Sequence, residues 1–257
     1  MESLGDAEHE ARSRMNVELD KHLTLTEKAF NLVSETTAAI PDRPITEATQ
    51  SFKVAVPLLN KVSNDLRTAS LLALWGYPTQ ALSLVSSLYE SAFTIAHIGA
   101  DNELAQRWID HEDPTKAFGN MIDLTRSGLR KLGTPDADQQ ATVEYRVYSQ
   151  LSMAKHTNPV YAQQHAYKRV DSRITSYNGP DISEPAIRAG WFALEHAAAL
   201  TCIALHSFIL NRVPSEARRG LISKLLEIGH MRKELEGRAR ERWGTEDPFP
   251  GGWRELT

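Results

Sequence analysis

The side chains best suited to chemistry lie on one face of a predicted central helix, between Tyr77 and Gly99. This segment is apolar on two sides, which is typical of a helix surrounded by other helices. A narrow polar row interrupts it at alternating spacings of four and three, which keeps the row on one face: Ser83, Ser87, Glu90, Thr94 and His97. Because an unpaired buried charge is costly, Glu90 must find partners or stay protonated. We take Glu90 as a candidate catalytic residue and His97 as a candidate binding residue.

A second polar row is predicted on a helix from Asp136 to His156, at successive spacings of four: Glu144, Tyr148, Ser152 and His156. If the two helices pack side by side, Glu90 meets Tyr148, Ser152 or His156. A carboxylate beside a histidine forms an acid–base pair or one corner of a metal site. The alternative is a polar network that only fixes helix register. Tyr148 and His156 are therefore candidate catalytic residues, and Glu144 and Ser152 candidate binding residues.

Metal and cofactor chemistry find little support in the sequence. A di-iron bundle needs two Glu-x-x-His pairs, and only Glu227 and His230 have that spacing. Cys202 lies in an apolar segment and has no second cysteine to pair with. Neither a phosphate-binding glycine loop nor a dinucleotide fingerprint is present. We expect no metal and no cofactor.

A basic segment lies within the longest stretch that lacks helical periodicity, residues 157–182. Its basic residues are interleaved with tyrosines, and the candidate binding residues there are Lys168, Arg169 and Arg173. Aromatic rings stack on the unpaired nucleobases of RNA, so this segment is a candidate RNA-binding surface. A formal net charge of −4 argues against general nucleic-acid affinity but allows such a local patch.

The bulk properties favour a protein of the cytoplasm. Hydrophobic residues make up 41% of the 257 residues, enough for a substantial core. No run of about eighteen apolar residues is present, so we expect no membrane span. The first residues are polar and acidic, unlike a secretory signal, and the single cysteine fits a reducing compartment.

Helical periodicity and capping residues predict an all-α protein, a single bundle of about seven or eight helices. The predicted helices span residues 6–40 with an interruption at Thr24–Thr26, 46–75 with a kink or break at Pro57, 77–99, 101–111, 113–132, 136–156, 184–212 and 215–243. A short hairpin is the one strand structure expected, between Tyr167 and Tyr177. The predicted organisation is an N-terminal helical arm (1–45), a bundle core with the long loop (46–212), and a charged C-terminal helix with its tail (213–257).

Three stretches carry a family resemblance: LLALWGYPTQALSLVSSLYESAFTIAHI, then LAQRW, and later YSQLSMAKHTNP. Their order resembles an uncharacterised bacterial family of helical domains of unknown function, over residues 66–209. That family has an Arg-x-x-x-Glu-like motif and a later Ser-x-x-x-His motif. The resemblance implies that Glu90 is the family glutamate and that Ser152 and His156 are the later pair. Ser86 stands where the arginine is expected, which implies an inactive or altered member if that arginine is needed.

The helical layout is also similar to the HEPN superfamily, many of whose members are RNases of toxin–antitoxin and anti-phage systems. Those nucleases carry an arginine and a histidine separated by four to six intervening residues, and activity follows from such residues rather than from the fold. Here Arg146 and His156 are too far apart and Arg107 and His111 too close, so no catalytic residue is carried over. Two functions stay open: a HEPN-like RNase or defence component with an RNA partner, and a non-catalytic, homodimeric interaction or regulatory protein. Whether the chain is an enzyme stays open with them.

Overall fold

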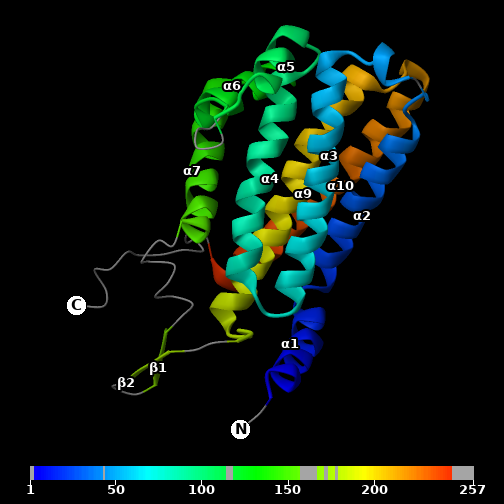
Figure 1. Cartoon of the computed structure of the whole chain (residues 1–257). Helices are drawn as coiled ribbons and strands as arrows, with labels where there is room; N and C mark the ends of the chain where they lie inside the picture. Colours follow the sequence, from blue (N-terminus) through cyan, green and yellow to red (C-terminus); the bar gives the residue numbers. More distant parts are fainter. Residues whose placement is uncertain are drawn as a thin grey trace.

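The protein is an all-α bundle, as predicted (Figure 1). The computed structural model describes residues 3–42, 44–113, 118–156, 167–170, 173–176 and 179–244. Within these ranges the elements are α1 (Leu4–Glu18), α2 (Asp20–Ala38), the 3-10 helix η1 (Ile45–Glu47), α3 (Gln50–Leu74), α4 (Pro78–Ile98), α5 (Asn102–Ile109), α6 (Met121–Lys131), α7 (Ala137–Lys155), β1 (Tyr167–Val170), β2 (Arg173–Ser176), α9 (Glu184–Arg212) and α10 (Ser215–Trp243).

Helix α4 lies at the centre and packs against α3, α6, α7 and α9 (Figure 1). Pro78 occupies its first turn, and Gly99 ends it with a positive φ of 54°, as the sequence predicts. Tyr89 and Phe93 of α4 and Phe208 of α9 are among the largest fully buried side chains. One hydrophobic cluster extends from Met15 in α1 to Leu235 in α10. Most of the bundle therefore shares a core around α4 and α9, and a smaller cluster of Val54, Ile98 and Ala105 joins α5 to α3 and α4.

The break in the first predicted helix lies at Leu19, and the prediction of Thr24–Thr26 is wrong. Leu19 has φ −102° and ψ 2° and is fully buried, so it turns the chain between α1 and α2 while filling the core. The hydroxyls of Thr24 and Thr26 donate to the carbonyls of Asp20 and Leu23, at 3.0 and 2.9 Å, inside α2. These threonines bond within one continuous helix and cap none.

Helix α3 runs without interruption through Pro57, so the predicted break there is wrong, and the alternative of a kink stays a prediction. Proline removes one backbone hydrogen bond, but Ala55 and Leu59 on either side are almost fully buried and hold the helix against the core. The helix also begins later than predicted. Residues 45–47 form η1, and the Thr49 hydroxyl caps α3 by accepting from the Phe52 N–H at 3.2 Å.

The other boundaries follow their predicted caps, with one exception. Asp101 caps α5 as predicted, accepting from the N–H groups of Glu103 and Leu104 at 3.0 Å. Helix α6 begins at Met121 with Asn120 as its cap, not at residue 113; residues 114–117 lie outside the described ranges. The predicted hairpin is present: β1 and β2 are antiparallel, with Lys168 opposite Thr175.

In the described part of the chain, α9 is long and apolar enough to cross a membrane, although the sequence was expected to hold no such segment. Of its most apolar window, 67% is buried inside the bundle. The core helix of a soluble protein has the same properties, so this is weak evidence for a span. The absence of a membrane segment and the cytoplasmic location stay predictions.

Gly128 in α6 lies where this helix touches α4. A Cβ atom on Gly128 would be 2.9 Å from the Cβ of Ala96, which cannot rotate away. Gly128→Val should therefore lower the free energy of unfolding by about 1–3 kcal/mol, measured by urea titration. Gly220→Val in α10 is the matched control, because a Cβ there meets nothing within 4 Å. Equal stability of the two variants would show that α6 does not pack closely on α4.

Candidate functional site

The two predicted polar rows meet where α7 packs on α4. The Tyr148 hydroxyl donates to Glu90 Oε1 at 3.0 Å, and Lys155 Nζ donates to the same oxygen at 2.9 Å. The hydroxyl oxygens of Ser86 and Ser152 lie 3.3 Å apart across the same interface. We call these five residues the Glu90 cluster. The predicted contact between Glu90 and Tyr148 is present.

The Glu90 cluster is reached by solvent and its charges are matched. The side chains of Glu90 and Lys155 are 34% and 36% exposed, so their ion pair contributes about 0–1 kcal/mol to stability. Burial raises the pKa of Tyr148 to about 12; a hydrogen bond with Ser152 opposes this rise, and the Glu90 carboxylate adds to it. Tyr148 is therefore protonated near neutral pH and can donate a proton but not accept one.

Tyr89, next to Glu90 in the sequence, extends this polar contact into the core. Its ring centroid is 4.9 Å from that of Tyr148, and its hydroxyl is 2.9 Å from the Thr125 hydroxyl of α6. Burial raises the pKa of Tyr89 far above its ordinary value. Tyr89 is not part of either polar row predicted from the sequence, so its hydroxyl contact was missed.

His156 does not contact Glu90, which corrects one expectation. Helix α7 ends at Lys155, and His156, with φ −102° and ψ 26°, has left the helical path that the spacing of four assumes. Its side chain is exposed, and its backbone N–H donates to the Ser152 backbone carbonyl. The neighbouring Lys155, which the sequence did not single out, takes its place beside Glu90. A catalytic role for His156 stays a prediction without this contact.

The rest of the α4 row divides between its neighbours. The Ser87 hydroxyl accepts from Lys61 Nζ of α3 at 2.7 Å. His97 lies two turns beyond Glu90, with its ring centroid 6.2 Å from that of Phe118 and its Nδ1 buried without a partner in the described residues. Burial, with the charge of nearby Lys131, lowers the pKa of His97. His97 is thus outside the Glu90 cluster.

Glu144 and the basic residues of the hairpin both lie outside the Glu90 cluster. Gln140 Nε2 donates to Glu144 Oε1 at 2.8 Å, one turn away on α7. Lys168 and Arg169 are in β1 and Arg173 in β2; their backbone register is described and their side chains are not. The structure therefore brings together Glu90, Tyr148 and Ser152 from the predicted set. The others are separate.

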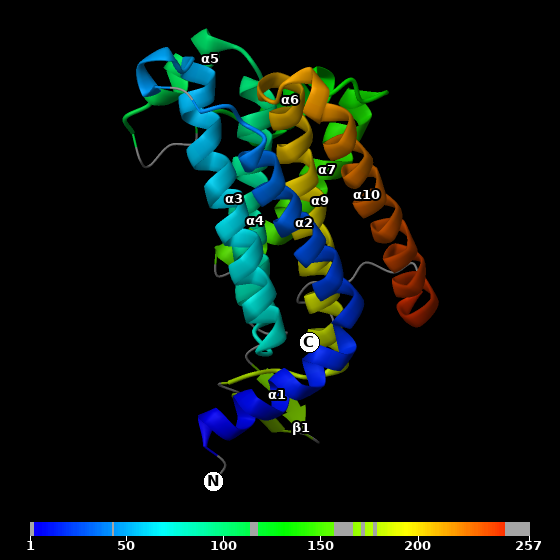
Figure 2. The same cartoon turned by 90° about the vertical axis from the view of Figure 1, so that its right-hand side faces the viewer.

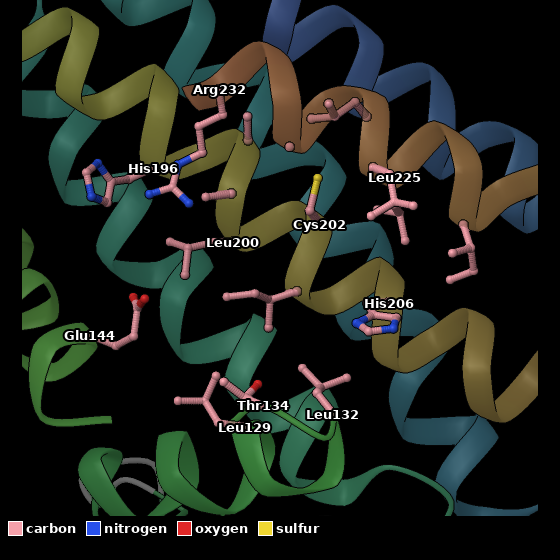
Figure 3. A pocket seen from close by; sticks show the side chains of 17 residues that line it. Leu129, Leu132, Thr134, Glu144, His196, Leu200, Cys202, His206, Leu225 and Arg232 are labelled. Carbon is pink, nitrogen blue, oxygen red and sulfur yellow. The ribbon is translucent and has the colours of Figure 1, made fainter. Parts of the chain in front are cut away.

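Sequence analysis missed a hollow of about 350 Å³ on the outer side of α9, which we call the trough (Figure 3). Helix α7 packs on α4 and α6, and α10 packs on α2 and α9, so the outer side of α9 stays uncovered between them (Figure 2). Its apolar lining includes Leu129, Leu132, Leu200, Ile203, Leu225 and Ile228. Its polar lining includes Glu144, His196, Cys202, His206 and Arg232.

Most polar groups of the trough are uncharged near neutral pH. Burial, with the charge of Arg232, lowers the pKa of His196 to about 4, and burial lowers that of His206. Burial also raises the pKa of the Cys202 thiol to about 12. The sequence signal that could have indicated the trough is a pair of histidines, His196 and His206, on a mostly apolar helix. They lie at opposite ends of the trough.

A second hollow, of about 380 Å³, adjoins the trough, and both are lined by His196 and Arg232. Trp191, Phe192 and Trp243 line this second hollow. Arg232 Nε donates to Glu195 Oε1 at 3.2 Å, and burial raises the pKa of Glu195 despite that pairing. The junction of the two hollows is thus the most polar part of this side of α9.

No site for a metal ion was found in the described ranges: no three His, Cys, Asp or Glu side chains there are grouped to hold one. The Glu227 and His230 pair therefore has no described partners that would complete a metal site. The expectation of no metal stays a prediction, as does the expectation of no cofactor.

No protein-family model matches this chain, and neither a curated protein nor a solved structure matches it. The resemblances to the helical family of unknown function and to the HEPN superfamily therefore stay predictions from the sequence.

Tyr148→Phe tests the hydrogen bond at the centre of the Glu90 cluster. It removes the hydroxyl while keeping the ring contact with Tyr89, so unfolding free energy should fall by about 0.5–1.5 kcal/mol in a urea titration. Tyr145→Phe is the matched control on the same helix, because its ring lies 5.9 Å from Tyr148 without a described hydroxyl bond. Equal losses in both variants would contradict a stabilising Glu90–Tyr148 bond.

Proposed function

We propose that this chain is a non-catalytic binding protein of the interaction or regulatory class, and that its ligand occupies the trough. The observation that carries this proposal is the trough's lining: a largely apolar hollow with a few converging polar groups. Its volume of about 350 Å³ is within the range typical of small-molecule sites, roughly 300–1,000 Å³. The polar groups there are mostly held neutral, as in a site for an apolar molecule.

The Glu90 cluster supports a structural role better than a catalytic one. Glu90 Oε1 already accepts from both Tyr148 and Lys155, which leaves that oxygen poorly placed to take a proton from a substrate. Carboxylate and ammonium charges cancel, and Ser86 with Ser152 adds a second polar contact between the same helices. Such a network fixes the register of α4 and α7.

The homodimer predicted from the sequence belongs to the same proposal. Leu226 of α10 lines the trough and is 61% exposed, which leaves a large apolar side chain at its rim. Exposed apolar residues beside a binding hollow are common at protein contacts. A second copy of the chain is the partner that we propose.

Filling the trough tests the binding proposal. Gly229 lines it, and a Cβ there meets nothing within 4 Å, so Gly229→Phe should place a ring in the hollow without disturbing the fold. The uncharged dye Nile red should brighten with the unmodified chain and bind at least tenfold more weakly to Gly229→Phe. Gly220→Phe is the control, because it is equally open but lies outside the trough. No dye uptake, or equal uptake by all three proteins, would refute the proposal.

A second candidate function, a HEPN-like RNase or defence component, is favoured by one observation. A carboxylate, an ammonium group and a hydroxyl meet at the solvent-reached edge of α4 and α7 in Glu90, Lys155 and Tyr148. RNA cleavage requires a base, a cation for the phosphate and an acid, and these groups match those roles. The basic hairpin follows α7 in the sequence and supplies the RNA contacts in this candidate.

Single-stranded RNA at low salt separates the two functions. We expect the unmodified chain to leave the RNA intact, because Glu90 is already paired. Cleavage that Glu90→Gln abolishes would replace the binding proposal with the second candidate. The combined variant Lys168→Glu and Arg169→Glu tests the hairpin: where the unmodified chain binds RNA, the loss of two positive charges should abolish binding. A gel assay with intact and variant proteins measures both outcomes.

A further inference from the structure

Two polar side chains of the trough meet at the end opposite His206. His196 of α9 and Arg232 of α10 line both the trough and the neighbouring hollow. Figure 3 shows the Arg232 side chain extending from α10 toward His196. A ligand lying in the apolar part of the trough would place its end group between these two residues.

His196 offers a hydrogen-bond acceptor at this end. Its Nδ1 is 2.8 Å from the Phe192 carbonyl oxygen. A carbonyl can only accept, so Nδ1 carries the proton in this bond. Because burial keeps the imidazole uncharged near neutral pH, the second nitrogen, Nε2, has a free lone pair. His196 can therefore accept a hydrogen bond from a donor on the ligand.

Arg232 offers donors beside that acceptor. Its Nε is bonded to Glu195, while its two terminal nitrogens have no hydrogen-bond partner in the described part of the chain. A guanidinium can donate through all of its N–H groups, so it can serve Glu195 and a ligand together. Arg232 can therefore donate to an acceptor on a ligand at the same end.

The charges around this end disfavour an ionic group. An anion would meet the carboxylates of Glu195, which is 8% exposed, and of Glu144, which lines the trough. A cation would meet Arg232. An uncharged end group is repelled neither by these carboxylates nor by the Arg232 guanidinium.

The apolar part sets the length of the ligand. The trough follows α9 from His196 to His206, ten residues that span about 15 Å at a rise of about 1.5 Å each. Leu200 and Ile203 of α9 and Leu225 of α10 line it. A saturated chain of roughly ten to twelve carbons matches that span.

We propose that the trough binds an uncharged apolar molecule of about this length with a hydroxyl group at one end, held between His196 and Arg232. The hydroxyl donates to His196 Nε2 and accepts from a terminal nitrogen of Arg232, which satisfies both residues. A ketone or ester oxygen would satisfy Arg232 only, and a carboxylate would face Glu195 and Glu144. This inference rests on the proposed function, because it names the ligand class of the same site.

Displacement of Nile red from the intact chain tests the end group. 1-Decanol should displace the dye, whereas decanoate, decylammonium and 2-undecanone should each require at least tenfold higher concentration. His196→Phe removes the acceptor but keeps an aromatic ring, so it should bind 1-decanol about tenfold more weakly. The double variant Arg232→Met with Glu195→Gln removes the donors without stranding a buried carboxylate, and should have the same effect. Lys233→Met, at an exposed position on α10, is the control and should bind as the unmodified chain does.

The outcomes distinguish this inference from the proposed function. If Nile red does not bind the intact chain, the proposed function fails and the inference fails with it. If the dye binds and all four probes displace it equally, or decanoate displaces it best, the hydroxyl assignment is overturned while the trough remains a binding site. If His196→Phe and the Arg232→Met, Glu195→Gln double variant both bind Nile red and keep unchanged affinity for 1-decanol, His196 and Arg232 do not hold the end group. Far-UV circular dichroism confirms that each variant is folded.

Discussion

The rest of the structure depends on the burial of α4. A helix that is apolar on nearly every side must be surrounded, and α3, α6, α7 and α9 together surround it. The polar side chains of α4 can then reach solvent at few places. Ser87 and Glu90 reach the surface between α3 and α7, where Lys61 and Lys155 meet them. The Glu90 cluster is a consequence of this enclosure: a carboxylate on a buried helix is tolerated where partners and solvent remain within reach.

The position of α9 has a different consequence. Its inner side completes the core against α4, while its outer side is covered by α10 along only part of its width. Polar residues on that outer side are neither fully solvated nor fully paired. Burial keeps His196, His206 and Cys202 uncharged, and Arg232 lines the same hollow and extends toward His196 (Figure 3). Because α7 and α10 lie apart on either side of α9, they leave between them an apolar hollow with His196 and Arg232 at one end.

The ends of the bundle are closed by more specific contacts. At one end, the buried Arg212 of α9 donates to the carbonyls of Ser51 and Gly99, which ties the start of α3 to the end of α4. At the other, Arg242 of α10 bonds to Glu18 and Glu184 and lies 4.8 Å from the centre of the Trp243 ring. These contacts fix the ends of α9 and α10, so the trough between them is held by the fold itself.

The sequence alone determined the helices, because capping and periodicity act over a few residues. Pro78, Gly99 and Asp101 mark the boundaries that they predict, and the two predicted polar rows gave Tyr148, Ser152 or His156 as the partner of Glu90, of which Tyr148 is present. Only the structure showed that Lys155 lies beside Glu90 where His156 was expected, since the end of α7 displaced the histidine from the spacing of four. The trough was also beyond sequence reasoning. Its lining comes from α6, α7, α9 and α10, and no local pattern records how far apart separate helices come to lie.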